Sequence, residues 1–73
     1  MLSIRLCKLR YEQGWSQEAL AEKLNTSRQT ISKWESGKSL PSIDNLILIR
    51  NVFNVSYEEL LDEYRSTDLE SRL

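Results

Sequence analysis

The chain contains no histidine, only one cysteine, one proline and two glycines among its 73 residues. Without histidine or a second cysteine it lacks the usual ligands of a zinc site and the usual partners of a catalytic nucleophile. Its two isolated glycines, Gly14 and Gly37, do not form a glycine-rich phosphate-binding loop. The sequence therefore argues against an enzyme, and we expect no metal and no cofactor.

Cysteine and long apolar runs are also scarce. Cys7 has no second cysteine to pair with, and a small domain without disulfides fits a reducing cytoplasm. The longest apolar run, Leu46 to Ile49, is far shorter than the ~20 residues that cross a bilayer. Near the N-terminus, Arg5, Lys8 and Arg10 interrupt the apolar residues, unlike a secretory signal. We expect a cytoplasmic protein with no membrane partner.

Charge is divided unevenly along the chain, although the formal net charge is only −1. Residues 1–40 carry seven bases and four acids, whereas residues 41–73 carry three bases and seven acids. Salt screens charges beyond about 8 Å, so a basic front and an acidic back can coexist. The basic half could face nucleic acid, or both halves could be ordinary solvated surface; charge alone leaves both interpretations open.

Apolar spacing and capping residues predict five short helices. Four of the predicted starts follow a serine whose hydroxyl can accept a hydrogen bond from a free backbone amide: Ser16, Ser27, Ser42 and Ser56. The predicted helices cover about residues 3–13, 17–24, 28–35 and 43–53, with a short fifth helix after residue 56. Residues 1–65 are thus predicted to form one all-α domain, and residues 66–73 a polar, frayed tail.

The second and third predicted helices have the features of a helix-turn-helix. This motif needs a tight turn between two helices that cross at about 90–120°. Ala21 is small enough for a close backbone approach, and Asn25 tolerates a positive φ at the turn. Both helices carry apolar anchors for a shared core: Leu20, Leu24, Ile31 and Trp34. We therefore expect Trp34, and Trp15 before the motif, to pack in the domain rather than stack on bases.

Two runs in this region, WSQEALAEKL (15–24) and SRQTISKWESG (27–37), closely resemble the phage-repressor-like helix-turn-helix family, also called xenobiotic-response-element-type regulators. The resemblance extends over about residues 2–62. It implies a compact five-helix, lambda-repressor-like DNA-binding domain with the helix-turn-helix formed by helices two and three. It also implies a transcriptional regulator, expected to be a repressor, whose third helix (about 28–35) enters the major groove of operator DNA.

The resemblance further implies roles for individual residues. Base contacts are implied for Arg28, Gln29, Thr30 and Lys33. Phosphate contacts are implied for Gln17, Ser27, Ser36 and Lys38. An internal ion pair is implied between Arg10 and Glu35. Side-chain chemistry supports two of these assignments independently, because arginine suits bidentate contact with guanine and glutamine with adenine. For the exposed residues, a place on ordinary solvated surface is the alternative.

The fourth predicted helix leaves the partner question open. Ile47, Leu48 and Ile49 are consecutive, so they cannot all face one side of a helix, and Ile47 or Leu48 should be exposed. The exposed surface could form a homodimer through helices four and five, with two reading helices on an inverted repeat. It could instead dock against another domain. A protein-interaction module of the same fold, such as an antitoxin or coactivator-like adaptor, is the alternative function.

Overall fold

The computed structural model describes residues 2–61, which form five helices. They are α1 (Leu2–Gln13), α2 (Gln17–Lys23), α3 (Arg28–Ser36), α4 (Ile43–Phe53) and α5 (Tyr57–Leu60). No strand occurs between residues 2 and 61, so the predicted all-α, five-helix fold is confirmed. The predicted helix limits agree within a residue or so. The predicted boundary at residue 65 and the tail 66–73 lie outside the described residues.

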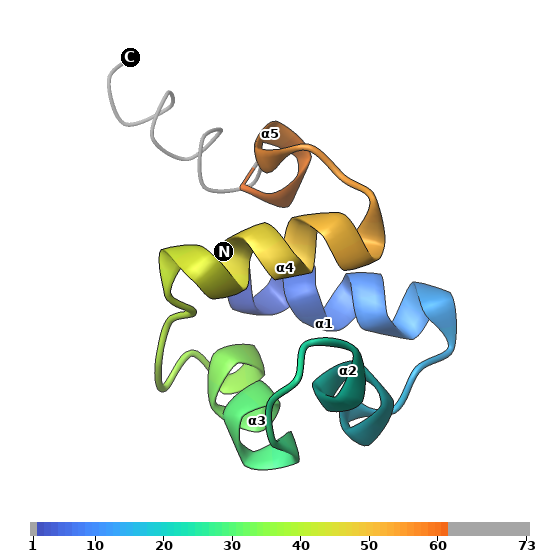
Figure 1. Ribbon diagram of the computed structural model, residues 1–73, viewed down its shortest axis with the longest axis vertical. Coiled ribbons are helices and arrows are strands. Elements are labelled where there is room, and N and C mark those ends of the chain that lie inside the picture. The colour runs from blue at the N-terminus through green and yellow to red at the C-terminus, as the bar shows by residue number, and fades with distance from the viewer. Residues whose placement is uncertain (1, 62–73) are drawn as a thin grey trace.

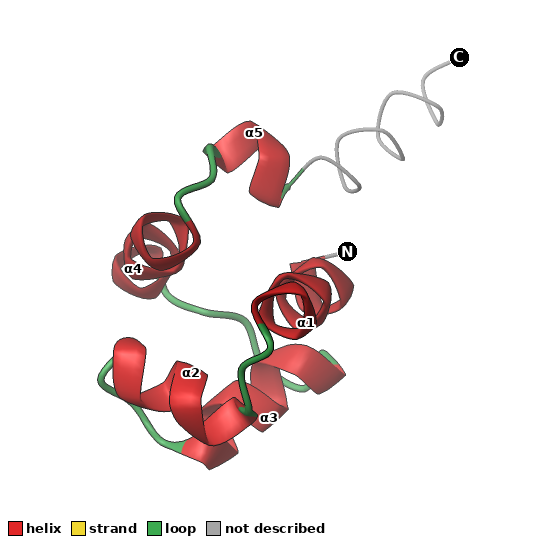
Figure 2. Cartoon of the chain, turned by 90° about the vertical axis from the view of Figure 1, so that its right-hand side faces the viewer, coloured by secondary structure: helices red, strands yellow, loops and turns green. Residues whose placement is uncertain are grey.

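The helices are arranged around a middle layer formed by α1 and α4 (Figure 1). The pair α2 and α3 covers one side of this layer, and α5 covers the other, as the turned view shows (Figure 2). The helix-turn-helix formed by α2 and α3 therefore lies at one end of the domain, with α3 at the surface. None of the helices between residues 2 and 61 has both the length and the apolar character needed to span a membrane.

A single apolar core joins all five helices. Its buried members are Leu6, Leu20, Ala21, Leu24, Ile31, Trp34, Ile49, Phe53 and Leu60. Trp34 is only 5% exposed, and the Trp15 ring packs against Phe53 with ring centroids 5.4 Å apart. The ammonium group of Lys23 lies 4.5 Å from the centre of the Trp15 ring, a cation–π contact. Both tryptophans therefore serve packing, as predicted.

Local chemistry explains where the helices begin and turn. Each predicted capping serine accepts a hydrogen bond from the backbone amide three residues later, at 3.0–3.3 Å, in α2, α3, α4 and α5. Between α2 and α3, Asn25 has a φ of 54°, the left-handed conformation expected for the turn. Gly37 ends α3 with a φ of 78°, where a larger residue would be strained. These caps and turns are confirmed by the structure.

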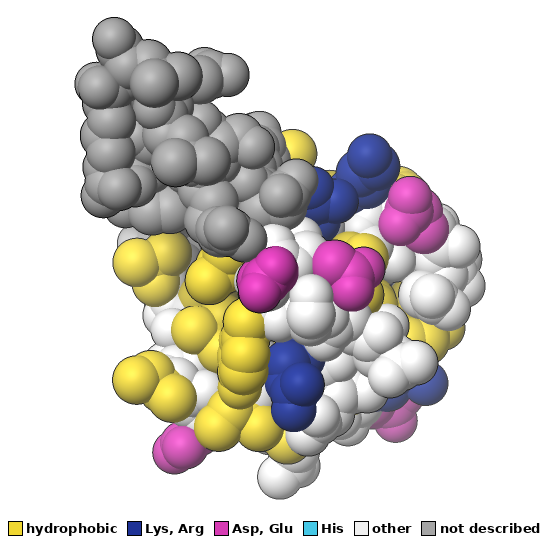
Figure 3. Space-filling model, turned by 90° about the horizontal axis from the view of Figure 1, so that it is seen from above, with side chains coloured by type: hydrophobic (Ala, Val, Ile, Leu, Met, Phe, Trp, Pro, Cys, Tyr) yellow, Lys and Arg dark blue, Asp and Glu magenta, His cyan; other side chains and the backbone are white. Residues whose placement is uncertain are grey.

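Several large hydrophobic side chains remain exposed on and near α4. Ile47 and Leu48 are 39% and 41% exposed, whereas Ile49 is fully buried. Leu40, in the loop before α4, and Ile43, the first residue of α4, are more exposed still. Figure 3 shows exposed hydrophobic side chains gathered along one side of the molecule. The prediction that Ile47 or Leu48 is exposed is confirmed, and in fact both are.

Candidate nucleic-acid interface

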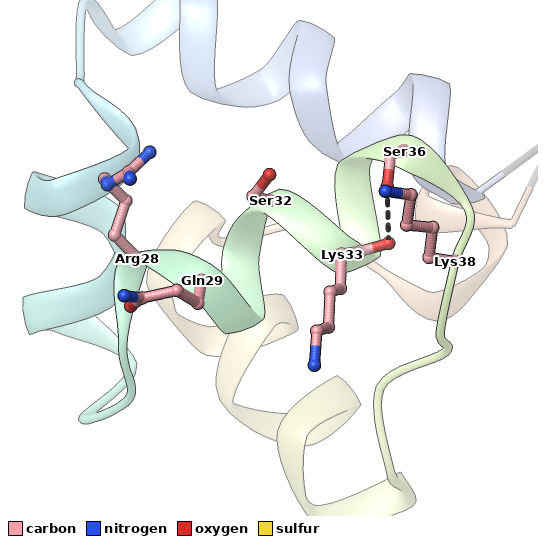
Figure 4. A pocket seen from close by; sticks show the side chains of 6 residues that line it. All are labelled: Arg28, Gln29, Ser32, Lys33, Ser36 and Lys38. Atoms are coloured by element: carbon pink, nitrogen blue, oxygen red, sulfur yellow. Dashed lines mark hydrogen bonds between the residues drawn. The ribbon is translucent and has the colours of Figure 1, made fainter.

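The outer side of α3 forms a concave polar surface, which we call the α3 face (Figure 4). It holds a hollow of about 230 Å³ that is open to solvent. Six residues line it, five on α3 and one just beyond: Arg28, Gln29, Ser32, Lys33, Ser36 and Lys38. Three of the six side chains are cationic, three are neutral and polar, and none is acidic.

Helical periodicity separates the α3 face from the core. Ile31 and Trp34 point inward and are buried, whereas Arg28, Gln29, Lys33 and Ser36 on the other side of the helix are exposed. On the outer side the lining residues form two rows (Figure 4). Arg28, Ser32 and Ser36 follow each other at four-residue steps, one turn apart, in the first row. Gln29 and Lys33 form the second row.

The end of α3 brings one more cation to this surface. Gly37 turns the chain back, and the backbone amide of Lys38 donates to the carbonyl oxygen of Lys33 at 2.9 Å. The Ser36 hydroxyl donates to the same oxygen at 3.2 Å. Lys38 therefore lines the α3 face although it lies beyond the helix.

The cations of the α3 face are not neutralised by neighbouring carboxylates. Among residues 2–61, Arg28, Lys33 and Lys38 form no ion pair, and all three are exposed. Uncompensated positive charge around a concave surface attracts polyanions and raises their local concentration. The electrostatics of the α3 face thus suit a phosphate backbone.

A buried ion pair joins the first three helices. Arg10 of α1 donates from Nε to Oε2 of Glu35 on α3 at 2.7 Å, and from Nη2 to Oε1 at 3.0 Å. The amide Nε2 of Gln17, the first residue of α2, donates to the same Oε1 at 3.0 Å. Arg10 also donates to the carbonyl oxygen of Trp15 at 2.8 Å. The side chains of Arg10 and Glu35 are 8% and 6% exposed.

The pKa shifts follow from this packing. Burial raises the pKa of the Glu35 carboxyl, but hydrogen bonds from Arg10 and Gln17 outweigh it and hold the pKa below its usual value. The hydrogen bond to Glu35 raises the pKa of Arg10. Burial, followed by the Glu35 charge, raises the pKa of the Cys7 thiol. Arg10 and Glu35 are therefore charged at neutral pH, and the raised pKa favours the protonated form of the Cys7 thiol.

Most of the predicted DNA contacts lie together on the α3 face. These are Arg28, Gln29, Lys33, Ser36 and Lys38. Sequence reasoning missed Ser32, which lines the same surface. The feature of the sequence that could have identified Ser32 is its spacing, four residues after Arg28 and four before Ser36. That DNA touches these residues stays a prediction.

Three other predicted contacts have partners within the domain. The hydroxyls of Ser27 and Thr30 lie 3.0 Å apart, and the Thr30 amide donates to the Ser27 hydroxyl at 3.2 Å. Thr30 is partly buried and does not line the α3 face. Gln17 holds Glu35 through one of its two amide hydrogens. These residues first of all build the helix-turn-helix, and their contact with DNA stays a prediction.

The fold and the α3 face define a helix-turn-helix protein of the lambda-repressor-like class. Comparison with protein families agrees, because the model of the helix-turn-helix family matches residues 6–60. The chain belongs to this family.

Its curated relatives carry the names of transcriptional regulators. The HTH-type transcriptional activator BcrR of Enterococcus faecalis is 47% identical over 57 residues, covering 78% of this chain and 28% of BcrR. The HTH-type transcriptional regulator ImmR of Bacillus subtilis is 37% identical over 60 residues, 82% of this chain and 47% of ImmR. The HTH-type transcriptional regulator SinR of Bacillus subtilis is 34% identical over 74 aligned positions, 100% of this chain and 67% of SinR.

The chain is shorter than the relatives it matches first, since it spans 28% to 56% of their length. No solved structure was found to match it.

Proposed function

We propose that this chain binds double-stranded DNA sequence-specifically as the reading domain of a transcriptional regulator. The observation that carries the proposal is the α3 face, a concave surface with two cations on α3 and a third, Lys38, just beyond it, none of which forms an ion pair within residues 2–61. A major groove about 12 Å wide admits such a helix, and its first turn lies closest to the bases. Arg28 and Gln29 occupy that first turn and have side chains suited to guanine and adenine edges.

Residues around the ends of α2 and α3 would fix the domain on the DNA backbone. Lys38 and Ser36 lie where α3 ends, and Gln17 keeps a second amide hydrogen besides the one donated to Glu35. Phosphate contacts of this kind set the register of a helix in the groove without reading sequence. We assign Gln17, Ser36 and Lys38 to this role, and Lys33 and Thr30 to the edge of the base-reading surface.

Gln29→Ala should change which base pair is preferred at one position of the site. The lost amide removes a bidentate contact that is worth about 1–3 kcal/mol of discrimination. Binding sites selected from random DNA by the original chain and the variant, followed by titrations on both sites, measure this change. If the variant keeps both the preference and the affinity, the assignment of the first turn of α3 to the bases is wrong.

Lys38→Ala serves as the control for Gln29→Ala. Loss of a phosphate contact should weaken binding to all sequences alike and lower the slope of log K against log salt by about 1. The selected sequence should stay the same. A new base preference in Lys38→Ala would contradict its placement on the backbone.

Repression is the regulatory effect that we propose, because a domain bound within a promoter blocks the access of other proteins to that promoter. A chromosomal target would also place the protein in the cytoplasm.

The alternative function is a protein-interaction module such as an antitoxin or adaptor. In that case, selection of binding sites at about 50 mM salt would enrich no DNA sequence. A regulator should enrich one, and its affinity should fall steeply as salt rises.

We further propose that two copies pair through α4 and α5 on an inverted-repeat site. The support is the exposed pair Ile47 and Leu48, together with Tyr57, which is 43% exposed. The Arg50 guanidinium lies 4.9 Å from the centre of the Tyr57 ring and links the two helices at this surface. A two-fold pair would place the two α3 helices about 34 Å apart, one turn of DNA.

Sedimentation at micromolar concentration tests the pairing. We expect a monomer–dimer equilibrium that Leu48→Glu shifts to monomer, since a charge would be buried between the copies. Ile4→Glu is the matched control, because Ile4 lies on α1 and is 58% exposed. A sample that stays monomeric, with a selected site lacking two-fold symmetry, would contradict this pairing and leave docking against another domain as the alternative.

A further inference from the structure

The side-chain amide of Gln17 is held by the domain itself. Its Nε2 donates to Oε1 of Glu35 at 3.0 Å, and the residue is partly exposed. The same carboxylate accepts two hydrogen bonds from Arg10, at 2.7 and 3.0 Å. The Glu35 side chain is only 6% exposed and lies too deep to contact DNA. Any effect of Glu35 on DNA binding must therefore pass through the residues that it holds.

The charge of Glu35 decides which end of the Gln17 amide faces inward. Burial raises the pKa of Glu35, but hydrogen bonds from Arg10 and Gln17 keep that pKa below its usual value. The carboxylate is therefore ionised at neutral pH, and an ionised carboxylate only accepts hydrogen bonds. Gln17 must turn its NH₂ group towards Glu35, and not its carbonyl oxygen. One N–H of that group is left for a second acceptor, as a phosphate oxygen would be.

Arg10 fixes the backbone at the start of α2 as well. Its Nη1 donates to the carbonyl oxygen of Trp15, two residues before Gln17, at 2.8 Å. Between them Ser16 caps the helix, because its hydroxyl accepts from the amide of Ala19 at 3.0 Å. Both the backbone and the side chain at the start of α2 are thus tied to the network that ends on α3. Gln17 keeps a fixed place relative to the α3 face.

We propose that Glu35 is a positioning residue for DNA binding, which anchors the Gln17 amide so that its remaining N–H is presented to a backbone phosphate. The proposal rests on the DNA-binding function proposed above. A glutamine side chain that is already ordered loses less rotamer freedom on binding than a free one. Anchoring should therefore strengthen binding about tenfold, and on every sequence alike, because phosphates carry no sequence information.

The test compares two double variants that differ only at position 35. Arg10→Met with Glu35→Leu leaves Gln17 without an acceptor, whereas Arg10→Met with Glu35→Gln keeps an amide oxygen there. Neither pair of substitutions changes the net charge, and apolar replacement of a buried ion pair can preserve the fold. With Glu35→Leu, selected and unrelated DNA should both bind about tenfold more weakly than to the original chain. With Glu35→Gln, affinity should recover to within about twofold of the original.

Stability should change in the opposite direction, which separates positioning from a structural role. The double variant with Glu35→Gln buries an amide with fewer partners, so it should melt at a lower temperature than the one with Glu35→Leu. It should nevertheless bind DNA more tightly. Circular dichroism gives the melting midpoints, and DNA titrations well below them give the affinities. If affinity follows stability instead, so that the variant with Glu35→Leu binds at least as tightly, the proposal is overturned.

Gln17→Ala, made in two backgrounds, measures the coupling directly. In the original chain it should weaken binding to all DNA about tenfold and leave the salt dependence unchanged, because a neutral amide displaces no counterion. In the double variant with Glu35→Leu it should cost less than about threefold, since the contact is already weakened. Equal losses in both backgrounds, or no loss in either, would overturn the role of Glu35 and leave the proposed function standing. If the original chain selects no sequence from random DNA, the proposed function itself fails.

Discussion

Replacing Glu35 by alanine is expected to lower the free energy of unfolding by about 3–5 kcal/mol, because the substitution leaves a buried arginine without its counter-charge. Arg10 is 7% exposed and donates two of its hydrogen bonds to Glu35. Gln17 would lose its acceptor too. Small domains have only a few kcal/mol to lose, so a large fraction of the variant should be unfolded. Urea denaturation followed by circular dichroism measures the loss.

Two further variants separate the lost charge from the lost packing. Arg10→Met combined with Glu35→Leu removes both charges and should recover much of the stability, because apolar side chains can replace a buried pair. Glu12→Ala, at an exposed position on α1, should change stability by no more than about 0.5 kcal/mol. A loss below 1 kcal/mol in Glu35→Ala would contradict a structural role for the ion pair.

The same ion pair predicts the direction of the pH dependence. The pKa of Glu35 is lower in the folded protein than its usual value of about 4.3. Its contribution to stability is therefore complete above the unfolded pKa, and it is lost as the pH falls through the lower, folded pKa. Glu35→Ala should lack this part of the acid dependence, which unfolding measurements at pH 3 to 7 would detect.

Trp34→Ala should also destabilise the domain by about 3–5 kcal/mol, because it removes a large side chain that is 95% buried and leaves a cavity. Lys33→Ala is the matched control, since it changes the neighbouring residue on the exposed side of α3. It should keep its stability within about 0.5 kcal/mol and lose affinity for DNA. Chemical denaturation and DNA titration of both variants give the comparison. Intact stability with lost binding in Trp34→Ala would mean that Trp34 faces DNA.

The helices could be predicted closely from the sequence because their limits depend on local chemistry. A serine that caps a helix needs only the amide three residues later, and Gly37 and Asn25 act through their own φ angles. The burial of Ile31 and Trp34 followed from helical periodicity in the same way. Arg28, Gln29 and Lys33 fall on the outer side of α3 for the same reason.

Contacts between distant residues were harder to predict. Gln17 and Glu35 are 18 positions apart, and only the packing of α2 on α3 brings the amide to the carboxylate. The pattern of α4 required one of Ile47 and Leu48 to be exposed. It could not show that both are, because the rotation of a helix is set by its neighbours. Ser32 escaped notice because a short polar residue carries little signal until the surface around it is known.

The division of α3 into an inner and an outer side has a consequence for how such proteins diversify. Ile31 and Trp34 hold the helix in the core, while the side chains of Arg28, Gln29 and Ser32 make no hydrogen bond or ion pair with the rest of the described chain. Substitutions at these outer positions should therefore cost little stability. Point mutations at these positions can then change the target sequence while every variant along the way stays folded. One scaffold can therefore serve many different control sites.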